Sequence, residues 1–124
     1  MTFLTARFLV IVWMVGFAGS FVMQSVLQRW FAENSAWGRN MGWQNEIAIW
    51  NLGVFVALGG VLAADANLES AVLPGLAILS LCFGLNHARA LRDSPRSHSH
   101  WAGAVANGLG VVMYGAFLAR QLGG

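Results

Sequence analysis

Residues Asn45 to Gly60, with the sequence NEIAIWNLGVFVALGG, decide the fold that we expect for this chain. A carboxylate and an asparagine open the stretch, and an apolar run of aliphatic and small residues follows. The spacing of three or four positions places these residues on one helix face: Glu46, Trp50, Gly53, Ala57 and Gly60. The face is polar at one end and small at the other, so it predicts contact with other helices.

Composition indicates a chain that lies in a lipid bilayer. Hydrophobic residues make up 57% of the 124 positions, charged residues make up 10%, and the mean hydropathy is +0.61. Four apolar segments, each near the ~20 residues that cross a ~30 Å hydrocarbon layer, are expected to be helices. They cover residues 8–27, 46–64, 71–87 and 101–119. We therefore predict an all-α, integral membrane, up-down-up-down four-helix bundle that forms a single domain over residues 1–124.

The arginines predict the orientation in the membrane. All seven cations are arginine, and five of them lie in or beside the first and third connections: Arg29, Arg39, Arg89, Arg92 and Arg96. The positive-inside rule then places these connections in the cytoplasm and both termini outside, in what we expect to be a bacterial inner membrane. A net charge of +2 without a basic patch does not predict a nucleic-acid partner.

Small residues and one proline predict details of the helices. Three pairs are expected to be packing contacts: Gly16 with Ser20, Gly53 with Gly60, and Gly103 with Gly110. Val56 and Leu58 are expected nearer the lipid side. Ser70 is expected to cap the third span, which would place Pro74 in its first turn. With the lipid bilayer expected from the composition, the glycine faces predict association with other membrane subunits or a second copy of the chain.

The alternating direction of the spans predicts that polar side chains gather in one half of the bilayer. The residues expected there are Glu46, Asn51, Asn86, His87, His100 and Asn107, with Gln24 at a similar depth. One interpretation is a polar cavity with an ionisable pair of Glu46 and His87 and walls of asparagine. The other is that these groups only hold the helices together. The residues leave both interpretations open.

Motifs for metal binding and catalysis are weak in this sequence. His87, His98, His100 and Glu46 reach the same rim, but their spacing is not that of a transition-metal site, so no metal is expected. A haem between His87 and His100 is not expected either. The sequence has no nucleophilic triad, phosphate-binding glycine loop or catalytic carboxylate pair, so we expect no catalytic activity of its own.

Two segments carry a likeness to a known family. A glutamate precedes a glycine-rich apolar run in EIAIWNLGVFVALGG (residues 46–60), and the third span has a polar end in GLNHARAL (residues 84–91). The chain resembles the DoxX-like group of small four-helix bacterial membrane proteins in these two segments, in its length and in its polar first connection. The resemblance implies a link to membrane redox and sulfur metabolism, in some members as subunits of a quinone-reducing oxidoreductase. His87 and the SHSH segment of residues 97–100 lie outside this pattern.

Two functions follow as expectations. The first is a small accessory or binding subunit that associates through its glycine-rich faces and has a polar half-cavity on one side. The alternative is a membrane redox or transport protein whose cavity holds a quinone head group, a small solute or a proton. Trp50 and the asparagines would then surround the quinone ring, and His87 or Glu46 would exchange its protons.

Overall fold

The computed structural model describes residues 4–123, and this range is helical without any strand. The four long helices are α1 (Ala6–Ser25), α3 (Met41–Ala64), α4 (Ala66–Asp93) and α5 (His98–Gly123), and α2 (Gln28–Glu33) is short. The predicted all-α class is confirmed. Each long helix is long and apolar enough to cross a membrane.

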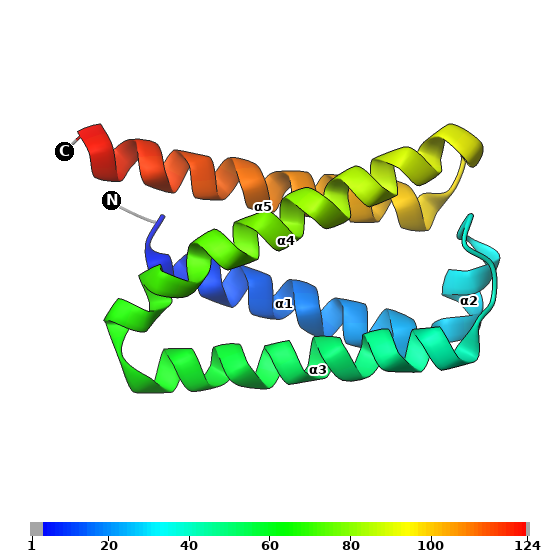
Figure 1. The fold of residues 1–124 in the computed structure, drawn as a ribbon, viewed down its shortest axis with the longest axis horizontal. Helices are drawn as coiled ribbons and strands as arrows, with labels where there is room; N and C mark the ends of the chain where they lie inside the picture. Colours follow the sequence, from blue (N-terminus) through cyan, green and yellow to red (C-terminus); the bar gives the residue numbers. More distant parts are fainter. Residues whose placement is uncertain (1–3, 124) are drawn as a thin grey trace.

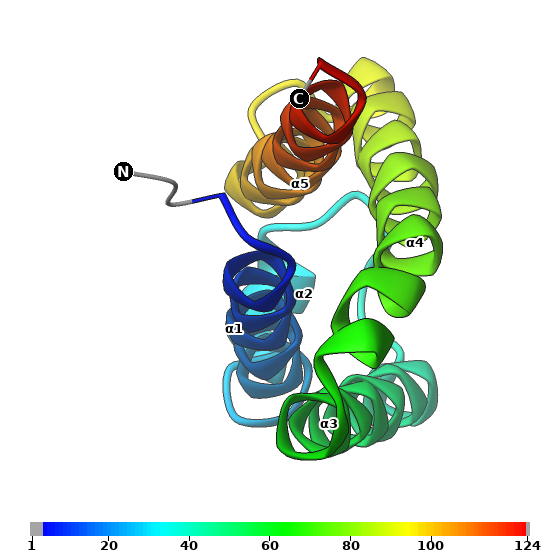
Figure 2. The same ribbon diagram turned by 90° about the vertical axis from the view of Figure 1, so that its left-hand side faces the viewer.

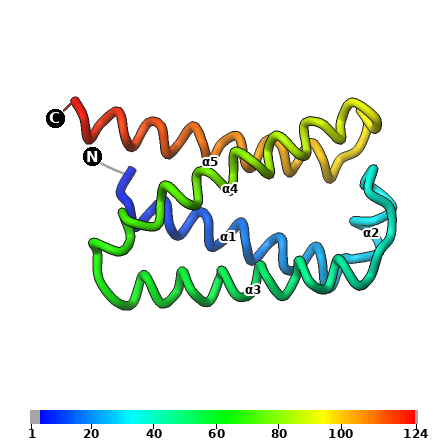
Figure 3. The backbone as a smooth tube through the Cα atoms, viewed as in Figure 1, coloured from blue at the N-terminus to red at the C-terminus, as the bar shows by residue number. Residues whose placement is uncertain are grey.

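The long helices lie lengthwise beside one another. In Figure 1 and in the tube of Figure 3, the turn between α3 and α4, the start of α1 and the end of α5 lie at one end of the molecule. We call it the Asp65 end, because Asp65 lies between α3 and α4. The short helix α2 and the connection of residues 94–97 lie at the opposite end, the α2 end. Helix α1 packs mainly along α3, α4 packs mainly along α5, and α1 also contacts α4 and α5. Figure 2 shows the four long helices arranged around a common axis.

Polar caps determine where three of the long helices begin. Thr5, Asn40 and Asp65 cap α1, α3 and α4, and each side chain accepts a hydrogen bond from a backbone N–H at the start of its helix. The expected start of the third span at Ser70 is therefore wrong, because Asp65 already begins α4 at Ala66. Pro74 consequently lies inside α4 and not in its first turn.

The buried apolar core lies toward the Asp65 end and receives side chains from all four long helices. Its members are Leu9, Val10, Trp13, Leu58, Leu73, Leu76 and Phe117. The Trp13 indole N–H donates a hydrogen bond of 2.8 Å to Ser80 Oγ. Gly110 allows this contact, because a Cβ at this position would lie 3.1 Å from Ser80 Oγ and 3.4 Å from the Trp13 ring.

Two expectations about helix faces are overturned by this packing. Leu58 was expected near the lipid side, but only 4% of it is exposed, because its side chain fills the core. Gly16 and Ser20 were expected on the packing face of α1, but both are exposed. A Cβ at Gly16 would meet no atom of the described residues within 4 Å. Bulky apolar side chains, rather than the small pair, therefore form the inward face of α1.

Candidate functional site

His87 of α4 and His100 of α5 meet at the α2 end of the molecule. Their Nδ1 atoms lie 3.0 Å apart, and His100 is fully buried. Gly103 makes this approach possible, because a Cβ there would lie 2.5 Å from Nε2 of His87. A side chain at position 103 would therefore displace the imidazole of His87.

The surrounding hydrogen bonds define which nitrogens carry protons. The backbone N–H of Ala36 donates to Nε2 of His100 at 2.9 Å, so this nitrogen supplies a lone pair. The proton of neutral His100 is then on Nδ1, which donates to Nδ1 of His87. His87 accepts with Nδ1 and carries its own proton on Nε2. The two rings thus form a directed chain of hydrogen bonds that begins at the backbone of Ala36.

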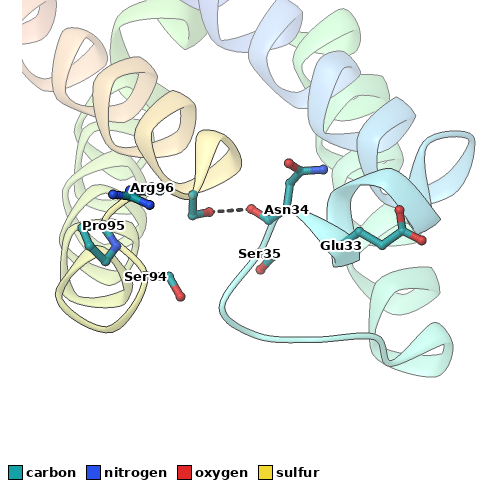
Figure 4. Close-up of a pocket in the computed structure, with 7 residues that line it drawn as sticks. Glu33, Asn34, Ser35, Ser94, Pro95 and Arg96 are labelled. Atoms are coloured by element: carbon teal, nitrogen blue, oxygen red, sulfur yellow. Dashed lines mark hydrogen bonds between the residues drawn. The ribbon is translucent and has the colours of Figure 1, made fainter.

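The connection of residues 34–37 is fastened to the start of α5. The hydroxyls of Ser97 and Ser99 both donate to the backbone carbonyl of Asn34, at 2.5 and 2.6 Å. Figure 4 shows the Ser97 bond at the edge of an open cleft of about 560 Å³ between the end of α2 and the connection of residues 94–97. Its lining residues are Glu33, Asn34, Ser35, Ser94, Pro95, Arg96 and Ser97. At this edge of the cleft, the hydrogen bonds of Ser97 and Ser99 to Asn34 therefore join its two sides.

Trp37 links the histidine pair to a second cavity. Its ring centroid lies 5.0 Å from that of His87 and 4.5 Å from that of His100. The next residue, Gly38, has a φ of 69°, which glycine adopts without strain and which turns the chain toward α3. Trp37 also lines a cavity of about 390 Å³, which we call the glutamine cavity. Its lining residues are Gln24, Phe31, Trp37, Gly38, Asn40, Trp43, Gln44, Ile47 and Asn86.

Two buried amide oxygens, on residues that line the glutamine cavity, have no hydrogen-bond partner within residues 4–123. They are the Oε1 atoms of Gln24 and Gln44, whose residues are only 7% and 6% exposed. The orientation of the Gln44 amide is fixed, because its Nε2 donates to the Gln28 carbonyl at 3.0 Å. A buried acceptor without a donor costs about 1–3 kcal/mol, so native structures rarely leave one unpaired. A donor in the cavity would remove this cost once the amides rotate to bring these buried oxygens to it.

The expected pair of Glu46 and His87 is not formed. The imidazole of His87 bonds to His100 instead, and Glu46 is exposed with no hydrogen bond or ion pair among the described residues. The reason is the orientation of α3, which turns Gln44, Ala48 and Leu58 inward. Glu46 and Trp50 therefore lie on its outward side.

The asparagines are divided between different environments. Asn86 lines the glutamine cavity. Asn51 and Asn107 each donate their side-chain N–H to a carbonyl four residues earlier in their own helix, at 2.8 Å in both cases. Only Asn86 among the three is therefore placed to meet a ligand in this cavity.

The predicted packing glycines also divide into two groups. Gly103 and Gly110 are packed closely against His87, Ser80 and Trp13 inside the chain. In contrast, a Cβ at Gly53 or Gly60 would meet no atom of the described residues within 4 Å. The whole face expected to contact other helices is exposed: Glu46, Trp50, Gly53, Ala57 and Gly60.

Several residues of the site were not anticipated from the sequence. They are Gln44, Ala36 and Trp37, together with the carbonyl of Asn34 that accepts from Ser97 and Ser99. The SHSH segment was the available signal, because a serine before a helix start predicts a cap. Ser97 does accept from the backbone N–H of His100, at 3.3 Å.

The geometry of the histidine pair does not fit a shared metal ion. Two nitrogens bound to one tetrahedral zinc at ~2.0–2.1 Å lie about 3.3 Å apart. The observed separation of 3.0 Å is that of a hydrogen bond, and Nε2 of His100 is already occupied by the N–H of Ala36. Within residues 4–123, no group of three or more His, Cys, Asp or Glu side chains could hold a metal.

The chain was also compared with known proteins. No family model, curated protein or solved structure matches it. The resemblance to the DoxX-like group therefore stays a prediction.

Proposed function

We propose that the chain is a four-span integral membrane protein that binds a small amphiphilic molecule at the α2 end. The membrane location is supported by the surface of the long helices, where large apolar side chains are exposed along the middle of each helix. Examples are Val15, Val56, Ile78 and Val112. Soluble monomers rarely expose apolar patches of this extent, whereas lipid is the natural contact for them.

For the orientation, the distribution of arginines supports an arrangement with the α2 end in the cytoplasm and both termini outside, in a bacterial inner membrane. In a Cys82→Ser background, a cysteine at Arg96 should resist a membrane-impermeant thiol reagent in intact cells. A cysteine at Asn67 should react, because it lies at the Asp65 end. Both positions are exposed, so accessibility within the protein is matched. Reversed labelling would reverse the orientation without affecting the bundle.

Binding is supported by one observation, the two buried and unpartnered amide oxygens on residues that line the glutamine cavity. The cavity volume of about 390 Å³ falls within the usual range for small-molecule sites. Its lining combines aromatic rings with a few amides, a composition suited to holding one polar head group in a mainly apolar site. The position at one end of the long helices suits a molecule with a polar head and an apolar tail.

A cavity-filling variant tests this proposal. The protein should be extracted in a mild detergent, and its bound small molecules should be identified by native mass spectrometry. Asn86→Trp should fill the cavity and remove the bound species, whereas Asn67→Trp, at the exposed Asp65 end, should retain it. A species retained equally by both variants would be bound elsewhere, and the proposal would be wrong.

The redox alternative has less support in this geometry. It depended on Glu46 and Trp50, which are exposed on the outward side of α3. A quinone head group presents carbonyl acceptors, whereas the unpartnered atoms of the cavity are acceptors as well. The oxidised ring therefore does not satisfy them.

A second candidate function, an accessory subunit, is favoured by the exposed face of α3 that extends from Glu46 to Gly60. We propose a second copy of the chain as its occupant, because a two-fold axis brings the same small residues of two α3 helices together. Gly53→Leu should then abolish cross-linked dimers in membranes. Val56→Leu is the matched control, because Val56 is also exposed on α3. Dimers that survive Gly53→Leu would show that another surface is used.

A further inference from the structure

We infer that the glutamine cavity is specific for an uncharged amphiphile whose head group donates at least two hydrogen bonds. The inference rests on the proposed function and specifies the chemical class of its ligand. Three properties of the cavity support it: its hydrogen-bonding polarity, its lack of charge and its shape.

The buried polar atoms of the lining residues that lack a partner are both acceptors. Gln44 cannot reverse its amide without losing the bond from its Nε2 to the Gln28 carbonyl, so its Oε1 stays available as an acceptor. The Oε1 of Gln24 is likewise buried and unpaired within residues 4–123. The terminal torsion of a glutamine is soft, so small rotations bring these oxygens toward a donor in the cavity. Hydroxyl or N–H groups satisfy them, and ether or carbonyl oxygens do not.

The lining contains no charged side chain, which decides against an ionic ligand. All nine residues around the cavity are neutral, and four of them are amides. A buried ion needs a counter-charge or several hydrogen bonds to offset its lost hydration.

Shape and surroundings favour a single flat head group with an apolar tail. Phe31, Trp37 and Trp43 contribute aromatic rings to the lining. An engineered apolar cavity of about 150 Å³ holds benzene, so about 390 Å³ has room for one ring and its substituents. Ile47, which also lines the cavity, is partly open to the outside of α3, where the apolar surface continues toward the middle of the helix. A tail leaving the cavity along this surface would enter the lipid.

A pair of probes tests the need for donors directly. 4-Hexylresorcinol has a ring, a tail and two hydroxyl donors, whereas its dimethyl ether keeps the ring and tail but has no donor. Each should be titrated into the full-length protein in nanodiscs, with the heat from protein-free nanodiscs subtracted. We expect saturable binding of 4-hexylresorcinol at one site per chain, and at least about 5-fold weaker binding of the ether.

Variants connect the preference to the two glutamines. Gln24→Met and the double variant Gln24→Met with Gln44→Met remove the acceptors at similar side-chain volume, so both should reduce the preference for 4-hexylresorcinol. The single variant leaves the bond from Gln44 to Gln28 intact, so it tests the preference even if the double variant is unstable. Gln121→Met, at an exposed position near the carboxyl end of α5, should keep the full preference.

The outcomes separate this inference from the proposed function. Equal, saturable binding of both probes would overturn the donor requirement but would still show a binding cavity. A preference for 4-hexylresorcinol that Gln24→Met does not change would have the same meaning. Absence of saturable binding for both probes would overturn the ligand class. The proposed function itself fails only if Asn86→Trp leaves the naturally bound species in place.

Discussion

Nδ1 of His100 donates a hydrogen bond to Nδ1 of His87 across 3.0 Å, and the direction of this bond is set by a third residue. Only one of the two facing nitrogens can carry the hydrogen. The backbone N–H of Ala36 occupies the lone pair on Nε2 of His100 and so places the His100 proton on Nδ1. The connection between α1 and α3 therefore determines the tautomers of the residues that join α4 to α5.

This arrangement predicts opposite tautomers for the two rings. In protein labelled with ¹⁵N-histidine, His100 should show a protonated Nδ1 and an unprotonated Nε2, and His87 the reverse, because each ring has one donor and one acceptor role. His87→Asn and His100→Asn variants assign the signals. The same tautomer in both rings, or a doubly protonated ring at neutral pH, would contradict the hydrogen-bond chain.

Removing the nitrogens of His100 should destabilise the protein. His100→Phe keeps a ring in this fully buried position but loses the bonds to Ala36 and His87, with an expected loss of about 1–3 kcal/mol in the free energy of unfolding. Glu46→Gln is the control, because Glu46 is exposed and forms no hydrogen bond among the described residues. Thermal unfolding in detergent measures both. Equal midpoints would mean that the pair contributes nothing to stability.

Periodicity predicted the inward face of one helix correctly and that of another incorrectly. On α5, the expected packing pair of Gly103 and Gly110 does turn inward, against His87, Ser80 and Trp13. On α3, the same reasoning selected the face from Glu46 to Gly60, which is exposed. Nearly every face of α3 is apolar or small, so spacing shows which residues lie together but not which face turns inward. Side-chain volume does not decide this either, because Ala48 is 3% exposed and the much larger Trp50 is 74% exposed.

The candidate site could be predicted in position but not in its partners. Alternating spans correctly placed His87, His100 and Asn86 at the same end as Gln24, because this depends only on chain direction. The partner of His87 depended on how the connection of residues 34–37 folds. That segment has no helical periodicity, so its contacts with α5 could not be read from the sequence.

The close approach at Gly103 predicts a position-specific cost for an added methyl group. Gly103→Ala would place its Cβ against the His87 ring, so we expect a loss of about 1–3 kcal/mol from displacing that ring. Gly115→Ala adds the same methyl group to open space on the same helix, where helix propensity favours alanine by roughly 1 kcal/mol. The unfolding midpoints should therefore move in opposite directions. A loss at both positions would mean that the cost is not specific to the contact with His87.

The last prediction contrasts the two ion pairs of the described residues. Arg7 and Glu69 lie 2.9 Å apart with side-chain exposures of 59% and 6%, whereas Arg29 and Glu33 lie 3.0 Å apart at 80% and 60%. Arg7→Met leaves a buried carboxylate without its partner and should cost about 1–3 kcal/mol. Arg29→Met should cost under about 0.5 kcal/mol, because water already solvates and screens that pair. Unfolding in denaturant measures both variants. Adding Glu69→Met to Arg7→Met should restore most of the stability by removing the unpaired charge, and a double variant as unstable as Arg7→Met would place the loss elsewhere.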